Sequence, residues 1–549
     1  MTTQSANTRT ALGWWKPSGA QPVTDPALMQ EALRTIREPL YALDLDGAVA
    51  LAIGGNAQMG ADAGRTSGAL PVLAWAPAID LARLGDPSFC ADHHIRYPYV
   101  AGSMANGISS VELVEAMARA GCLGFFGAAG LETDKIAAAI DRLIRSLGTL
   151  PFGVNLIHNP AEPDMEAAAV DLFLRKDIRL VEAAAYLNLT LPLVRYRVHG
   201  IHRDAAGEVV APNRIIAKVS RVEVATRFLS PPPANLLRAL VASGELSEAG
   251  AAMAAEIPMA EDLTAEADSA GHTDNRSLVD LFPTLASLRD RMTETHRYRR
   301  PPRVGAAGGI SSPLSAAAAF SMGAAYLVVG SVHQSCAESG TSPVVRELLA
   351  AAGQADTAMA PAADMFEMGV RVQVLKRGTM FAMRAAKLYD AYRAYDSIEA
   401  LPGPERERLE AEIFQAPLED VWRQTREFFL RRDPEQVHRA EADPHHRMAL
   451  VFRWYLGLAS RWANAGDPGR RMDYQIWCGP AMGAFNEWVR GTFLSELGSR
   501  RAAAVALNLV FGAAVQLRLN TLRAQGAALP AGAARVRPLE IERIEEQLR

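Results

Sequence analysis

The chain has 549 residues, of which 49% are hydrophobic and 21% are charged. This composition excludes a disordered protein, and the length indicates two or three domains unless one of them is a large barrel. The net charge of −4 provides no general attraction to nucleic acid, so no nucleic-acid partner is expected.

The cysteines lack Cys-x-x-Cys spacing, so we expect no disulfide framework and no metal site; they are Cys90, Cys122, Cys336 and Cys478. The N-terminal stretch MTTQSANTRTALGWW has no apolar core of an export signal, which predicts a cytoplasmic protein. The apolar segment 502–517 contains Asn508 and Gln516 and is short for a membrane span, so we expect a buried helix and no membrane partner.

Residues 1–95 are predicted to form a lead-in subdomain with one strand-like piece, ALDLDGAVALAI. From about residue 96, apolar strands alternate with amphipathic helices, and two short helices are expected between 228 and 257. The predicted strands are YPYVAG (97–102), CLGFFGAAG (122–130), PFGVNLI (151–157), IRLVEAAA (178–185), RIIAKVS (214–220), a strand in the stretch beginning at 258, PPRVGAAGGI (301–310) and AAYLVVGS (324–331).

Eight such units in succession predict an α/β fold, a (β/α)8 TIM barrel, over residues 96–360. A doubly wound open sheet is the main alternative, but the Gly-x-Gly-x-x-Gly turn common in that fold is missing. Residues 361–549 are predicted to form a helical C-terminal region, including FEMGVRVQVLKRGTMFAMRAAKLYDAY (366–392).

Two glycine turns follow the seventh and eighth predicted strands. Gly308 and Gly309 precede ISSP, and Gly330 and Ser331 end the last strand. Small residues let a phosphate approach backbone N–H groups, and the start of a following helix favours negative charge. This corner of a barrel is a frequent phosphate site. Glycines can also simply terminate strands, but two such turns in succession favour a phosphate-bearing ligand.

Other candidates lie where strands end, because barrel enzymes place their chemistry there. They are Ala101, Gly102, Ser103 and Met104 after the first strand, Asn155 at the end of the third and Lys218 in the fifth. Small residues let a flat ring lie against backbone, an amide can hydrogen-bond a ring edge, and an ammonium can stabilise a reduced ring. Structural alternatives exist: Asn155 as a helix cap, Lys218 as an ion-pair partner and Met104 as core.

His272 lies on the small-residue turn AEADSAGHTDN after the sixth strand. Imidazole exchanges a proton near neutral pH, so His272 is the candidate acid-base residue. Glu266 or Asp268 could orient it. Equally, those acids could cap the following helix, whose sequence TDNRSLVDLF begins with Thr273 and Asp274, both suitable N-cap types.

Several of these stretches resemble the FMN-dependent nitronate monooxygenase/2-nitropropane dioxygenase superfamily: PYVAGSMANGISSVELVEAMARAGCLGFFGAAGL, PFGVNLIHNP, AEADSAGHTDNR, AAGGISSP and AAYLVVGSVHQ. Three more resemble its PfaD branch, the trans-acting enoyl reductases of polyketide and polyunsaturated fatty acid synthases: NRIIAKVSRVEVATRF, EMGVRVQVLKRGTMFAMRAAKLYDAY and YQIWCGPAMGAFNEWV. The likeness covers about residues 90–500. Ala270 departs from the superfamily, which commonly has glycine there, and this affects turn geometry more than chemistry.

The resemblance implies a TIM barrel that binds FMN, uses NADPH as reductant and reduces an α,β-unsaturated thioester on an acyl carrier protein. By position it implies that Gly308, Gly309, Gly330 and Ser331 hold the FMN phosphate, that Ala101, Gly102, Ser103 and Met104 line the isoalloxazine, and that Asn155 and Lys218 contact the ring. His272 takes the place of the superfamily's active-site histidine, as proton donor to the α-carbon or anchor of the thioester carbonyl. Solvent is the alternative donor, and a homodimer is possible.

Two other functions fit the same motifs. A nitronate monooxygenase would share the histidine and phosphate turns but would need neither NADPH nor a carrier protein. A synthase scaffold that has lost turnover would lack bound flavin. Carrier proteins are typically acidic, so a basic docking patch is expected. The candidate clusters, each of which could also be a solvated surface, are His296, Arg297, Tyr298, Arg299 and Arg300, and Arg431, Arg432 and Arg439.

Overall fold

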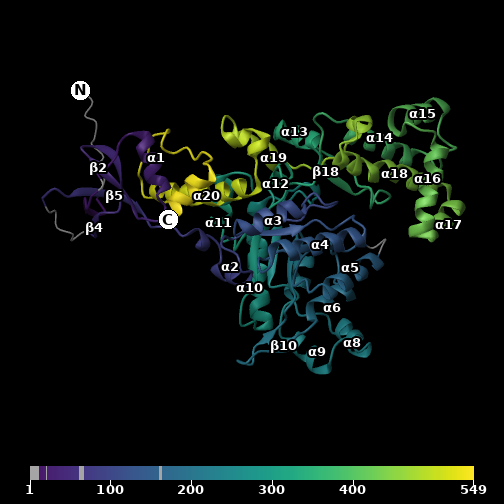
Figure 1. Cartoon of the computed structure of the whole chain (residues 1–549), viewed down its shortest axis with the longest axis horizontal. Coiled ribbons are helices and arrows are strands. Elements are labelled where there is room, and N and C mark those ends of the chain that lie inside the picture. The colour runs from purple at the N-terminus through teal and green to yellow at the C-terminus, as the bar shows by residue number, and fades with distance from the viewer. Residues whose placement is uncertain (1–10, 20, 61–66, 160–162) are drawn as a thin grey trace.

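The computed structural model describes residues 11–19, 21–60, 67–159 and 163–549. Its largest sheet is a closed barrel of eight parallel strands, so the predicted TIM barrel is confirmed. In Figure 1 helices that follow the barrel strands, among them α3, α4, α5 and α6, lie below α20. Each strand lies within the segment predicted for it, and the strands follow chain order around the barrel: β6 (Tyr99–Ala101), β7 (Leu123–Phe126), β8 (Gly153–Ile157), β9 (Leu180–Ala184), β12 (Arg214–Val219), β13 (Asp262–Glu266), β15 (Arg303–Ala307) and β16 (Leu327–Val329).

Amphipathic helices cover the outside of the barrel. In α4 the buried residues Ile136, Ile140, Leu143 and Leu147 recur at helical spacing and form one apolar face. The helices of this layer are α3 (Val111–Arg119), α4 (Thr133–Leu147), α5 (Pro163–Arg175), α6 (Leu191–Val198), α7 (Val222–Leu229), α10 (Leu278–His296), α11 (Pro313–Ser321) and α12 (Ser331–Gln334). The insertion contains the two predicted short helices, α8 (Ala234–Ala242) and α9 (Glu248–Ala254), and a hairpin of β10 (His202–Arg203) and β11 (Val209–Val210) precedes β12.

The lead-in contains a five-stranded antiparallel sheet at one end of the molecule (Figure 1). The stretch expected as one strand-like piece forms two strands, because Asp46 and Gly47 both have positive φ and make a tight hairpin turn between them. The elements are β1 (Gly13–Lys16), α1 (Pro26–Arg34), β2 (Leu40–Leu45), β3 (Ala48–Ile53), β4 (Asn56–Met59) and β5 (Leu70–Ala76), followed by η1 (Leu81–Arg83) and α2 (Pro87–Asp92).

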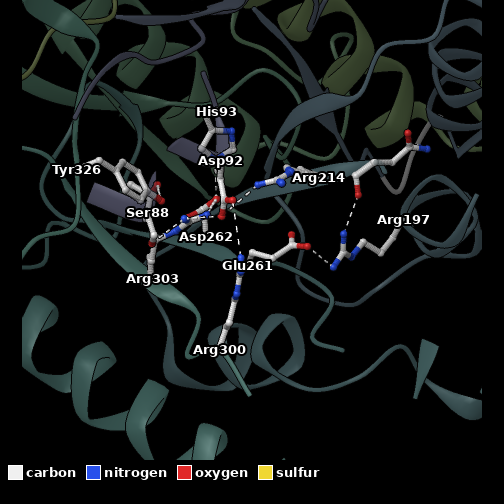
Figure 2. A network of polar contacts seen from close by, with 12 residues as sticks. Ser88, Asp92, His93, Arg197, Arg214, Glu261, Asp262, Arg300, Arg303 and Tyr326 are labelled. Atoms are coloured by element: carbon white, nitrogen blue, oxygen red, sulfur yellow. Dashed lines mark hydrogen bonds and ion pairs between the residues drawn. The ribbon is translucent and has the colours of Figure 1, made fainter. Parts of the chain in front are cut away.

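A buried polar network closes the amino-terminal end of the barrel (Figure 2). Arg303, at the start of β15, donates from Nε to Oδ1 of Asp262 at 2.6 Å and from Nη1 to Oδ2 of Asp92 at 2.8 Å. His93 Nε2 lies 2.7 Å from Oδ2 of the fully buried Asp262. Burial by itself raises the pKa of Asp262, but Arg303 and His93 lower it from 3.8 to about 2. Residues of the lead-in at the end of α2 therefore close the amino-terminal end of the barrel.

The C-terminal region is helical as predicted, except at its start. Residues 371–375 were expected to be helical, but RVQVL forms β18 (Arg371–Leu375), which pairs with β17 (Thr357–Pro361) and β14 (Gly271–His272). That expectation was wrong because β-branched Val372 and Val374 favour a strand and find partners there. Helix α13 (Pro343–Ala350) precedes β17, and the helices of the C-terminal region are α14 (Phe381–Ala394), α15 (Gly403–Arg408), the π-helix η2 (Leu409–Phe414), α16 (Leu418–Arg432), α17 (Pro434–Ala442), α18 (Pro444–Ala465), η3 (Pro468–Asp473), α19 (Pro480–Val489), η4 (Phe493–Ser495), η5 (Leu497–Ser499), α20 (Ala502–Ala524) and α21 (Ile541–Leu548).

Helix α20 connects the barrel to the N-terminal sheet, and it lies between them in Figure 1. Its length and composition would suffice to cross a membrane, but 89% of its most apolar window is buried inside the protein. Its buried Arg518 donates from Nη2 to the carbonyl of Glu38 at 2.9 Å and so holds the lead-in. The helix is therefore a core helix, as the sequence predicted. The four cysteines are buried as free thiols.

Candidate active site

A charged cluster lies where the barrel strands end. Glu182, in β9, is fully buried and accepts hydrogen bonds from the backbone N–H of Ser103, at 2.9 Å, and from the Ser103 hydroxyl. Lys218, in β12, places its Nζ 3.1 Å from Oε1 of Glu266 and 3.9 Å from Oε2 of Glu182. Residues from the loop after β6 and from β9, β12 and β13 thus converge at the carboxyl end of the barrel.

Each charge in this cluster changes the pKa of its neighbours. Burial by itself would lower the pKa of Lys218, but the carboxylates of Glu266 and Glu182 raise it, so Lys218 is a permanent cation. Burial raises the pKa of Glu182, and the Lys218 ammonium and the Ser103 hydrogen bonds oppose part of that shift. Oε1 of Glu182 is buried and has no hydrogen-bond partner among the residues described. An unsatisfied buried carboxylate oxygen needs a donor, and a bound ligand can supply one.

The other ring-lining candidates surround this cluster. Ala101 is fully buried at the end of β6, and the N–H of Gly102 donates to the carbonyl of Val329 at 3.1 Å. A Cβ at Gly102 would meet Val328 at 2.7 Å, so only glycine fits there. Asn155 lies beside Glu182 in the β8–β9 pair and donates from Nδ2 to its carbonyl at 3.3 Å, so it is not a helix cap.

The two glycine turns lie at the same end of the barrel. Gly308 and Gly309 both have positive φ, and a Cβ at Gly308 would be 2.7 Å from the Ala267 carbonyl carbon, whereas one at Gly309 would meet nothing within 4 Å. A Cβ at Gly330 would come within 4.0 Å of Met104 Cγ, and Ser331 begins α12. The turns after β15 and β16 therefore leave open space beside the loop after β6.

His272 lies in β14, outside the barrel wall, with half of its side chain exposed. Its Nε2 is 3.2 Å from Oδ1 of Asp364, in the connection between β17 and β18. Neither acid expected to orient it does so, because Glu266 pairs with Lys218 and Asp268 accepts from Asn275 at 2.8 Å.

The capping expectation was also wrong. The helix after the turn, α10, begins after Ser277. Asp274 instead accepts hydrogen bonds from Arg221 Nε, at 2.9 Å, and from Ser220. The hydroxyl of Thr273 accepts from the N–H of Asn275 at 3.0 Å, within the turn. These contacts shape the turn and leave the helix start without a side-chain cap.

The pH dependence of any reaction that uses His272 should respond to Asp364. Burial by itself lowers the pKa of His272, but the hydrogen bond and charge of Asp364 raise it above 6.5. An acid is active while protonated, so the Asp364→Asn variant should lose activity at lower pH than the wild type. The measurement is kcat/KM against pH in both proteins. An unmoved alkaline limb would show that the titrating group is not His272.

Sequence reasoning missed three residues of this region. Glu182 is a single acid inside an apolar strand, LVEAA, and an acid there is itself a signal of a built polar site. Gln373 holds the turn before His272, donating to Asp268 at 2.9 Å and to the carbonyl of Ser269 at 2.7 Å, but it lies in the segment expected to be helical. Asp364 carries no local sequence signal.

Comparisons with known proteins agree with this architecture. The sequence model of the nitronate monooxygenase family matches residues 87–398, which is more than half of the chain. A second model, of the inserted helical domain of [acyl-carrier-protein] S-malonyltransferase, matches residues 395–474.

Individual relatives cover most of this chain. One of the polyunsaturated fatty acid synthase subunits of Thraustochytrium sp. is 48% identical over 81% of the chain and 30% of that protein. Polyketide biosynthesis protein PksE of Bacillus subtilis is 43% identical over 79% of the chain and 56% of that protein. The crystal structure of the enoyl reductase domain of MlnA, from the macrolactin biosynthesis cluster of Bacillus amyloliquefaciens, is 38% identical with a TM-score of 0.77, over 81% of this chain and 99% of that one. The chain thus spans only about a third to a half of these two curated relatives.

Proposed function

We propose a function on the premise that the chain belongs to the nitronate monooxygenase family, in its PfaD branch of polyketide and polyunsaturated fatty acid synthase enoyl reductases. The chain is an FMN-dependent enoyl reductase that acts in trans on such a synthase. It uses NADPH to reduce the α,β-unsaturated thioester of an intermediate bound to an acyl carrier protein. The observation that carries the proposal is the convergence of Ser103, Glu182 and Lys218 beside the glycine turns.

The residues present fit FMN. Glu182 Oε1 is a buried acceptor without a donor among the described residues, which suits the N–H of an isoalloxazine ring. Gly102 has no room for a side chain, because Val328 fills that space, and this close packing holds the loop after β6 against β16. The open space at Gly309 suits a phosphate held by backbone N–H groups. When bound, FMN supplies hydride transfer between NADPH and the β-carbon of the thioester.

The protein's own groups prepare this site. Lys218 remains a cation and so stabilises negative charge that develops next to it. Glu266 and Glu182 hold its ammonium in place, and Ser103 in turn holds Glu182. His272 either donates a proton to the α-carbon or hydrogen-bonds the thioester carbonyl as the enolate develops. Such preorganised donors contribute about 100-fold or more to comparable reactions.

Residues 395–474, which we call the helical segment, are evidence for a carrier-bound substrate. This segment matches the inserted helical domain of a transferase named for the acyl carrier protein, and it follows the barrel directly in the chain. The partner is therefore an acyl carrier protein of the synthase. A protein that acts on the intermediates of such a synthase is expected in the cytoplasm. The oligomer that the family resemblance suggests is a homodimer.

The first experiment is an anaerobic absorption spectrum of the purified protein before and after addition of NADPH. We expect a flavin spectrum that NADPH bleaches and that a crotonyl thioester restores. A flavin that NADPH leaves unchanged, but an alkyl nitronate reduces, would favour nitronate oxidation, the activity for which the matching family is named. A protein without flavin, even after reconstitution with FMN, would favour a non-catalytic scaffold.

A further inference from the structure

A cleft of about 370 Å³ lies between the barrel and the helical segment. It is formed by the loop after β6, the start of α4 and the end of α18, and we call it the α4–α18 cleft. Its volume is in the range of small-molecule sites, which is about 300–1,000 Å³. The residues that line it are Asn106, Gly130, Leu131, Glu132, Lys135, Arg461, Asn464 and Ala465.

The cleft carries an excess of positive charge. Lys135 and Arg461 are both exposed, and neither has an ion-pair partner within the described ranges of the chain. The acid among the lining residues, Glu132, lies 3.8 Å from Arg432 Nη1 and is therefore compensated. Glu132 also precedes α4 without capping it, so the N–H groups at the start of this 15-residue helix are free of a side-chain cap, and Asp134 in the first turn offsets part of the helix dipole. An anion is the ligand that these surroundings favour.

One residue that lines the cleft, Asn106, is close in sequence to the candidate active site. Asn106 is two residues from Met104, so their Cα atoms are within about 8 Å of each other. The loop that joins them is fixed, because the N–H of Asn106 donates to the carbonyl of Ala129 at 2.7 Å and that of Gly107 to Gly127 at 2.9 Å. Asn106 Nδ2 also donates to the hydroxyl of Ser460, on α18, at 3.3 Å. The loop that carries Met104 therefore also forms one wall of the cleft.

Of the two basic clusters identified in the sequence, one lies beside this cleft and the other lies at the opposite end of the barrel. The cluster at residues 296–300 precedes β15 and therefore lies at the amino-terminal end of the barrel, where Arg300 is 4.0 Å from Asp92 (Figure 2). The packed interior of the barrel separates this cluster from the carboxyl ends of the strands. The cluster of Arg431, Arg432 and Arg439 lies on α16 and α17, and Arg432 reaches the rim of the cleft at Glu132.

We propose that the α4–α18 cleft admits the acyl arm of the carrier protein, and that Lys135 and Arg461 bind the phosphate through which that arm is attached. The proposal rests on the enoyl reductase function proposed above, which requires a thioester on a phosphate-bearing arm to reach the ring. Arg461 and Asn464 come from the helical segment that supports a carrier-bound substrate, whereas Lys135 comes from the barrel. The two parts of the chain therefore form the entrance together.

The test compares two substrates that differ only in the phosphate, crotonyl-4′-phosphopantetheine and crotonyl-pantetheine, on the FMN-loaded full chain. The wild type should have the lower KM for the phosphorylated arm, and Lys135→Glu and Arg461→Gln should each raise that KM about tenfold with kcat unchanged. Neither variant should affect crotonyl-pantetheine. Glutamate is acceptable in the first turn of α4, so Lys135→Glu should fold. Arg300→Glu, at the far end of the barrel, makes the same charge change as Lys135→Glu and is the control.

Binding of the unacylated arms, measured by calorimetry, separates this proposal from the proposed function. The cleft proposal is supported if the wild type binds 4′-phosphopantetheine more tightly than pantetheine and both variants lose this preference. If the same protein reduces no thioester, only the proposed reductase function fails. Equal binding of pantetheine and 4′-phosphopantetheine by the wild type overturns the proposal. So does a raised KM for NADPH in the variants with an unchanged KM for the phosphorylated arm, since the cleft would then hold the nucleotide.

Discussion

Replacement of His272 by glutamine is expected to lower the rate of enoyl thioester reduction by about 100-fold or more, while FMN remains bound. Glutamine can still hydrogen-bond a carbonyl but cannot exchange a proton near neutral pH, so the variant tests proton donation. His272 contacts Asp364 and takes no part in the cluster of Glu182 and Lys218, so loss of its imidazole should leave the flavin site intact. The measurements are single-turnover reduction of a crotonyl thioester and the flavin content of the protein.

Two further variants complete this test. His272→Ala removes both proton donation and hydrogen bonding, so a glutamine variant much faster than the alanine variant would assign His272 to anchoring of the carbonyl. His202→Gln, on the exposed hairpin of β10, should be indistinguishable from the wild type. Activity close to that of the wild type in both His272 variants would mean that solvent donates the proton, and it would remove His272 from the mechanism.

Replacement of Arg303 by methionine is expected to destabilise the barrel by about 3–5 kcal/mol. Methionine fills a similar volume but leaves the fully buried Asp262 without the two hydrogen bonds from Arg303, at 2.6 and 3.0 Å. A buried carboxylate that loses its partner retains its desolvation cost. For a barrel of this size the apparent Tm should fall by roughly 10 °C, measured by thermal unfolding followed by circular dichroism.

The control for this variant is Arg300→Met, in the same network. Arg300 is 88% exposed and lies 4.0 Å from Asp92, so its ion pair is screened by water and its loss should change the apparent Tm little. Equal Tm values for the two variants would contradict the assigned role of the network.

The low pKa of Asp262 also makes the stability of the folded protein depend on pH. The ionised Asp262 contributes about 2 kcal/mol to the free energy of unfolding above pH 3.8, and this contribution is lost as the pH falls through about 2.

Local sequence was sufficient for the barrel. A β strand buried on both sides is an apolar run, and an amphipathic helix repeats its apolar residues every three or four positions, so each of the eight units carries its own signal. The order of the units then leaves few ways to close the sheet, since parallel crossovers have one hand. The glycine turns and the ends of β6, β8 and β12 were also found this way, because barrel topology brings strand ends to one face.

The surroundings of His272 could not be found in this way, because they come from chain segments about a hundred residues apart. Asp364 and Gln373 meet the turn of His272 only when β18 pairs with β14. The β-branched Val372 and Val374 permit a strand at β18, and pairing with β14 and β17 decides it. The α4–α18 cleft likewise depends on packing, since Lys135 and Arg461 have ordinary surface patterns and become one site where two parts of the chain meet. Periodicity reports which side of an element is buried, whereas long-range contacts determine what each side chain faces.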